Sequence, residues 1–153
     1  VCFWRLLYKS FLPGLISGII FLLLVFINSQ NKKRFLYIVF LISIIGYLFD
    51  SILVNYGIYD FNTSLNVGVL PIWMIVLWPS FATLFDEILV FLSKHRFIAI
   101  ILSGSLGPLT YYSGNPLGLI YINNLTYFFI IMIVFWILLM LFYLKLLLRL
   151  NFN

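Results

Sequence analysis

The sequence predicts an all-α fold, a polytopic transmembrane helix bundle of five full spans plus the tail of a truncated first helix. Of its 153 residues, 65% are apolar and 8% are charged, against roughly 25% charged residues in a soluble domain. The mean hydropathy is +1.18, and the apolar segments approach the length of about 20 residues that crosses a bilayer. A water-soluble fold is therefore excluded. Connections this short leave no extramembrane domain, so residues 1–153 are expected to form a single transmembrane domain.

Each expected span is bounded by turn-forming or charged residues. The first has Pro13 near its entry, where a helix needs no backbone donor. The fourth is rich in glycine and serine, and the fifth is the most hydrophobic. Residues 1–8 are apolar but too few to span, so we expect them to end a helix that begins earlier. The five full spans are predicted at residues 12–28, 35–54, 71–92, 97–112 and 125–148.

The basic residues predict the orientation of the bundle. Lysines and arginines cluster after the first, third and fifth spans, while Arg5 and Lys9 fall on the opposite side. The positive-inside rule then places the larger group, and with it the C-terminus, in the cytoplasm. Because these bases lie at the ends of apolar segments rather than in one stripe, no nucleic-acid partner is expected.

The chain has too few cysteine and histidine residues for a metal centre. Cys2 is the only cysteine and His95 the only histidine, so no intramolecular disulfide, thiolate site or histidine-rich iron site can form. No cofactor is expected. A rhomboid-like serine protease is also excluded, because the Gly-x-Ser-Gly motif and an intramembrane histidine are both missing.

Acidic residues within apolar segments are the strongest candidates for function, since a charge in the bilayer interior costs at least about 2.5 kcal/mol. Asp50 shares a helical face with Ser43, Gly46 and Tyr47, and this stripe is expected to face protein. It serves either as a proton or ligand site or as a hydrogen-bonding contact to a neighbouring helix. These two alternatives stay open.

A second polar stripe lies in the third expected span. Thr83 and Glu87 share a face, with Asp86 beside them, and Pro79 is expected to kink this helix. Alternatively, Asp86 and Glu87 reach the cytoplasmic interface and pair with bases there. Asp50 and Asp86 should differ in depth by roughly 15 Å, which argues against a shared acid/base pair.

The fourth span carries small residues at spacings that allow close helix packing. Ser103 with Gly107, and Gly114 with Gly118, each form a small-x-x-x-small step. Aromatic residues, including Trp78 and Tyr111, are expected toward the outer face as an interfacial belt, with ligand stacking as the alternative.

The middle of the chain resembles a small bacterial inner-membrane family of unknown function. The resemblance rests on Asp50-Ser51, Pro71-Ile-Trp73, Leu77-Trp78-x-x-Phe81 and Gly107-Pro108-Leu109-x-Tyr111, spread over residues 46–120. Asp50, Trp78, Pro108 and Tyr111 match positions of the family's motifs, so the resemblance applies to these four residues. Asp86-Glu87 stands where the family usually has an asparagine, and Leu106-Gly107-Pro108 replaces Gly-Gly-Pro.

The resemblance also implies a location and a partner class. Members are often encoded near cyclopropane-fatty-acid-synthase-like and amine-oxidase-like proteins, and they carry a further N-terminal helix, which would give six spans with both ends inside. The implied location is the bacterial inner membrane. The implied partners are membrane lipids, and a lipid-modifying enzyme or other membrane subunits.

Three functions follow as hypotheses. The first is an accessory or lipid-handling factor linked to fatty-acid or lipid modification. The second is a small-molecule or proton-coupled transporter that uses Asp50, and the third a membrane enzyme that uses Asp86 or Glu87; no catalytic residue is assigned. The candidate polar or ligand-facing residues are Asp50, Ser51, Trp78, Thr83, Asp86, Glu87 and Tyr111, and those for packing or kinks are Gly46, Pro79, Ser103, Gly107, Pro108, Gly114 and Gly118.

Overall fold

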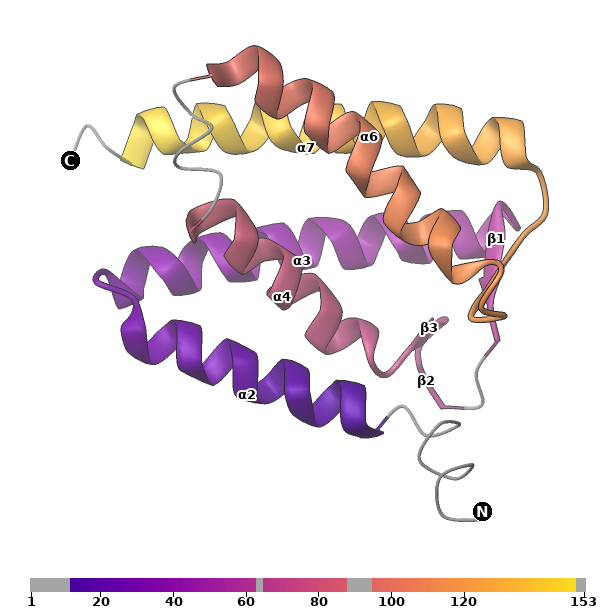
Figure 1. Ribbon diagram of the computed structural model, residues 1–153, viewed down its shortest axis with the longest axis horizontal. Coiled ribbons are helices and arrows are strands. Elements are labelled where there is room, and N and C mark those ends of the chain that lie inside the picture. The colour runs from indigo at the N-terminus through magenta and orange to yellow at the C-terminus, as the bar shows by residue number, and fades with distance from the viewer. Residues whose placement is uncertain (1–11, 63–64, 88–94, 151–153) are drawn as a thin grey trace. The chain divides into compact units, whose positions relative to one another are not determined.

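The computed structural model describes residues 12–62, 65–87 and 95–150, and this part of the chain is mostly helical. Its five helices follow the order of the five predicted apolar segments, but the third helix begins at Met74 rather than at residue 71, and residues 88–92 of that segment lie outside the described part. Two of them, Lys32–Asn55 and Leu125–Arg149, are long and apolar enough to cross a membrane, and the apolar helices Leu12–Asn28 and Met74–Leu84 are shorter. The helices, shown in Figure 1, are α2 (Leu12–Asn28), α3 (Lys32–Asn55), α4 (Met74–Glu87), α6 (Arg96–Gly114) and α7 (Leu125–Leu150).

A capping residue explains why α3 begins three residues before its predicted start. The Oδ1 atom of Asn31 accepts a hydrogen bond of 3.0 Å from the backbone N–H of Arg34. Asparagine is a favoured N-cap because its side chain satisfies a donor that the first helical turn leaves open. The three basic residues that the sequence suggested for a loop therefore form the first turn of α3.

Short strands correct the purely helical expectation. Strand β1 (Tyr59–Phe61) pairs antiparallel with β4 (Ile120–Ile122), so that Tyr59 lies opposite Ile122. Both segments consist mainly of aromatic and β-branched residues, which favour strands. A second pair, β2 (Asn66–Val67) and β3 (Leu70–Pro71), is joined by a tight turn in which Gly68 has φ +63°, a conformation typical of two-residue hairpins.

The chain forms two compact units, and the first comprises Val1–Ser51 and Leu65–Asp86. In its described part, α2 and α3 form a helical hairpin and α4 lies beside them (Figure 1). Two glycines allow α4 to approach both helices. A Cβ atom on Gly18 would lie 2.5 Å from Val76 Cγ1, and one on Gly46 would lie 2.2 Å from Trp78 Cδ2.

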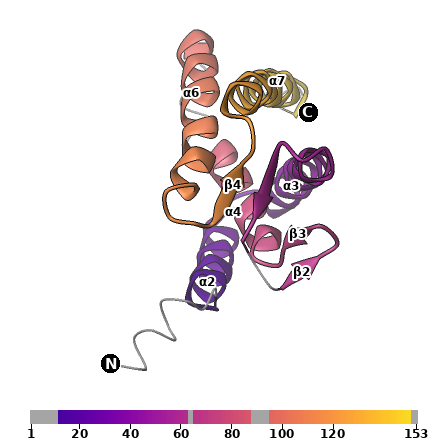
Figure 2. The same cartoon turned by 90° about the vertical axis from the view of Figure 1, so that its right-hand side faces the viewer.

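The second unit comprises Ile52–Ser64 and Glu87–Asn153, and its described part is dominated by α6 packed against α7 (Figure 2). Gly107 faces the indole ring of Trp136, where a Cβ atom would lie 2.2 Å from Cδ2. Ser103 is also buried in α6. The small residues at 103 and 107 therefore lie in the buried part of α6, and Gly107 lies at its contact with α7.

The second predicted small-residue step is wrong as a helix-packing motif. Gly118 lies beyond the end of α6, in the turn before β4, with φ +69° and no atom within 4 Å of an added Cβ. A glycine is suited there because the backbone is left-handed. Gly114 ends α6 and has only ordinary contacts with Leu119 and Ile120.

Candidate functional site

The centre of the candidate site is a hydrogen bond between α3 and α4 in the first unit. Trp78 Nε1 donates to Asp50 Oδ2 over 2.7 Å. The Asp50 side chain is fully buried and Trp78 is 1% exposed. The Asp50 face of α3 thus lies against protein, and its carboxyl group receives the polar end of a large aromatic side chain.

The spacing of residues on α3 explains this contact. Gly46 precedes Asp50 by four residues, so the two lie one above the other on the same face. The Trp78 ring lies where a side chain at position 46 would be. Gly46 therefore makes room for the six-membered part of the indole, while Asp50 binds its N–H group.

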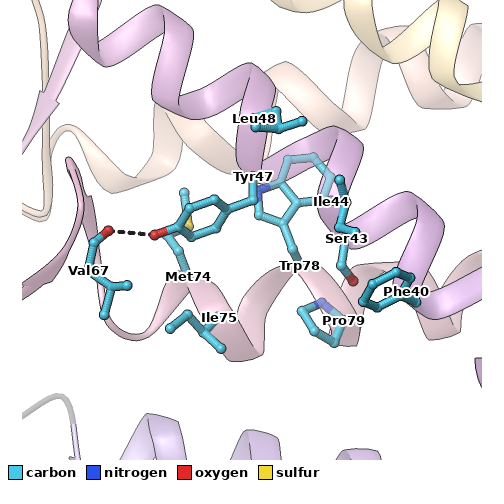
Figure 3. Close-up of a pocket in the computed structure, with 10 residues that line it drawn as sticks. All are labelled: Phe40, Ser43, Ile44, Tyr47, Leu48, Val67, Met74, Ile75, Trp78 and Pro79. Carbon is cyan, nitrogen blue, oxygen red and sulfur yellow. Dashed lines mark hydrogen bonds between the residues drawn. The ribbon is translucent and has the colours of Figure 1, made fainter.

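Beside this pair, α3, α4 and the β2–β3 hairpin line an open apolar groove of about 400 Å³ (Figure 3). Tyr47 reaches from α3 toward the hairpin, and its hydroxyl donates to the carbonyl oxygen of Val67. Trp78 forms part of the groove wall, whereas Asp50 does not. The lining residues are Phe40, Ser43, Ile44, Tyr47, Leu48, Val67, Met74, Ile75, Trp78 and Pro79.

The hydroxyl groups near the groove bond to their own helices. Ser51 Oγ donates to the carbonyl of Tyr47, and Thr83 Oγ1, although buried, donates to that of Ser80. Ser43 and Ser80 donate in the same way to residues four positions earlier. These side chains therefore satisfy local backbone carbonyls, as is common for serine and threonine inside helices.

The described residues contain no group of three or more His, Cys, Asp or Glu side chains that could hold a metal ion. The side chains of Asp86 and Glu87 lie outside the part of the structure that is described, so the polar stripe they form with Thr83 remains a prediction. Pro79 lies inside α4 and contributes to the groove wall.

Tyr111 and Pro108 belong to the second unit. Both are buried in α6, and the Tyr111 ring lies 5.9 Å from the ring centroid of Tyr59. An interfacial belt therefore does not describe Tyr111 or Trp78, because each packs inside protein. Belt residues would expose their polar ends at the membrane surface.

Sequence reasoning missed most of the groove lining. Phe40, Ile44 and Leu48 lie four residues apart on α3. This spacing places apolar side chains on one face of a helix and can be recognised in the sequence. Met74 and Val67 gave no such signal, since their role depends on how α4 and the hairpin pack against α3.

Fold and site together define a mostly helical protein with two helices that could cross a membrane, an apolar groove and a buried carboxyl–indole pair. The chain belongs to the family described as "Protein of unknown function (DUF2878)", whose profile matches residues 4–142. No curated protein matches the sequence. No solved structure matches it either.

Proposed function

We propose that the protein is a multi-pass protein of the bacterial inner membrane that handles lipids by holding an acyl chain in the α3–α4 groove. In this proposal all five helices cross the membrane, and the C-terminus is cytoplasmic. The observation that carries the proposal is the groove itself, which is apolar and open toward the exterior.

The exposed surface of α2 supports a membrane setting. This helix has no buried residue, and most of its exposed side chains are large and apolar, among them Leu23, Leu24 and Ile27. A soluble monomer seldom exposes an apolar patch of more than a few hundred Å², whereas lipid is a favourable solvent for such a surface.

The shape of the groove supports an acyl chain as its occupant. Its volume of about 400 Å³ falls within the range of about 300–1,000 Å³ found for ligand pockets. Phe40 and Leu48, on the α3 side of the groove, are 69% and 58% exposed. A lipid chain could therefore enter sideways without leaving the hydrocarbon phase.

The two alternatives receive less support. A proton carrier needs a carboxyl group that reaches a polar path, but Asp50 is held against Trp78 and does not line the groove. A membrane enzyme that used Asp86 or Glu87 would bring its substrate to the end of α4, whereas the groove lies along α4 near Met74 and Trp78.

Photo-crosslinking tests the groove. The purified protein would be reconstituted with phosphatidylcholine that carries a diazirine in its acyl chain, and crosslinked peptides mapped by mass spectrometry. We expect crosslinks at residues 40–48 and 74–79, reduced by Ile44→Trp, which fills part of the groove. Leu24→Trp adds a ring to the exposed surface of α2 and serves as the matched control.

Equal labelling of the wild type and Ile44→Trp in the groove peptides would refute a bound chain, because lipid would then only coat the surface. Labelling confined to α2 would refute it as well.

The proposed membrane arrangement has its own test. Two variants, Lys33→Cys and Asp60→Cys, each made in a Cys2→Ser background, should react with an impermeant maleimide from opposite sides of the membrane. Reaction of both from the same side would overturn the orientation.

An accessory role beside a lipid-modifying enzyme extends the proposal to the cell. Deletion of the gene should change the ratio of modified to unmodified acyl chains, measured by lipid mass spectrometry. Identical acyl-chain profiles in the deletion strain and its parent, in both exponential and stationary phase, would contradict this role.

A further inference from the structure

We infer that the groove selects an anionic phospholipid, whose phosphate is bound by Lys33 at the start of α3. This inference rests on the proposed acyl-chain groove and adds the class of headgroup.

Lys33 lies on the same face of α3 as the groove. Successive helical residues turn by 100°, so positions 33, 37, 40 and 44 fall within about 60° of one another around the axis. Tyr37, Phe40 and Ile44 are all exposed. An exposed strip of apolar side chains therefore leads from Lys33 into the groove.

The distance along α3 suits a lipid that lies parallel to the helix. Phe40 follows Lys33 by seven positions, so at 1.5 Å per residue the two lie about 10 Å apart along the helix axis. The flexible Lys33 side chain is exposed and extends beyond the helix. A phosphate at Lys33 would thus leave the acyl chain to follow Tyr37 and reach the groove at Phe40.

The local charges favour an anion at this position. Lys32, Lys33 and Arg34 form the first turn of α3, which contains no acidic residue. Positive charges at a helix N-terminus are unfavourable because the helix dipole is already positive there. A bound phosphate would relieve this repulsion and accept hydrogen bonds from Lys33.

The three bases differ in their surroundings, which singles out Lys33. The Lys32 ammonium lies over the ring of Phe26, 5.6 Å from its centroid, and Arg34 is half-buried. In the described part of the first unit, the acidic side chain is that of Asp50. It follows Lys33 by 17 residues on α3, about 25 Å along the helix axis, which is too far for it to pair with Lys33.

The expected orientation agrees with this assignment. The positive-inside rule places the start of α3 at the cytoplasmic surface, where anionic lipids attract basic residues. A phospholipid of the inner leaflet would then have its phosphate level with Lys33 and its chain in the groove.

Competitive lipid binding, measured by native mass spectrometry in a mild detergent, tests the inference. The probes are phosphatidylglycerol and phosphatidylcholine with identical acyl chains, offered to the wild type, Lys33→Gln and Lys32→Gln. We expect tighter binding of phosphatidylglycerol by the wild type. Lys33→Gln should weaken that binding about fivefold. It should weaken the binding of phosphatidylcholine less, because the choline ammonium offsets the charge of the same phosphate. Lys32→Gln, which removes the same charge, should change phosphatidylglycerol binding less than twofold.

Equal losses in the two variants would overturn the inference, since only diffuse charge would then matter. Equal affinity of the wild type for the two lipids would overturn it too. Glycerol 3-phosphate as a competitor separates a lipid headgroup from a free phosphate: displacement of phosphatidylglycerol at equimolar competitor would show a site for free anions and refute a lipid. Groove crosslinking by phosphatidylcholine with no preference for phosphatidylglycerol would leave the proposed function standing and reject the headgroup assignment alone.

Discussion

Replacing Asp50 with leucine should destabilise the protein, because it removes the acceptor of the buried bond from Trp78. The 2.7 Å bond joins two side chains that are at most 1% exposed. A bond to a charged group is worth about 1.5–3 kcal/mol in soluble proteins, and helix–helix bonds in membranes average about 0.6 and reach about 1.7 kcal/mol. We expect Asp50 and Trp78 to be coupled by about 1–2 kcal/mol.

Unfolding by sodium dodecyl sulfate in mixed micelles, followed by circular dichroism, provides the measurement. The cycle comprises the wild type, Asp50→Leu, Trp78→Phe and the double variant, so that the cavity left by the smaller ring cancels. Asp50→Asn keeps an oxygen acceptor and should lose under about 1 kcal/mol. Ser51→Ala, next in the chain, removes only a bond within α3 and should stay within about 0.5 kcal/mol. A coupling energy near zero would refute the reasoning.

Three further predictions concern close contacts and loop connections. Gly46→Ala should lower the free energy of unfolding by about 1–3 kcal/mol, because the added methyl group overpacks against Trp78. Gly14→Ala, with no atom within 4 Å of the added Cβ, should instead stabilise α2 by up to about 1 kcal/mol. The same unfolding assay compares the two variants, and equal effects would contradict the close packing of Gly46 against Trp78. Gly107→Ala should likewise destabilise the contact with the Trp136 ring, read out as a lower midpoint of thermal unfolding; an unchanged midpoint would be evidence against it. Asn123→Ala removes a 2.9 Å bond to the carbonyl of Gly57 and should speed amide exchange in β1 and β4, while unaltered exchange there would show that the strand pairing alone holds these segments.

The positions of the helices could be predicted well from the sequence. Segment 12–28 matches α2, and segment 97–112 matches α6 to within two residues at each end. These limits are set by local chemistry, namely apolar stretches interrupted by Asn, Lys, Gly and Pro. The earlier start of α3 depends on a side-chain cap at Asn31, which is local as well but is one of several possible caps in that polar turn.

The tertiary partners could not be predicted, because helical periodicity fixes a face but not its neighbour. The stripe around Asp50 indicated that the carboxyl group meets protein. It gave no reason to choose Trp78, which the aromatic pattern suggested for an interfacial belt. The strands were missed for a similar reason, since β1 and β4 are three residues each and depend on pairing between segments about 60 residues apart in the sequence.

Buried Asp50, together with Gly46 and Trp78, has a structural role that also affects the groove. Trp78 contributes one face to the groove while its N–H group is bound to Asp50, and Gly46 allows the ring to lie close to α3. An indole fixed at both its ring and its N–H group has few accessible rotamers, so the groove wall is preorganised before any ligand enters. In the proposed lipid site, Asp50 is then a positioning residue, a role that places a carboxyl group in an apolar helix without requiring proton transfer.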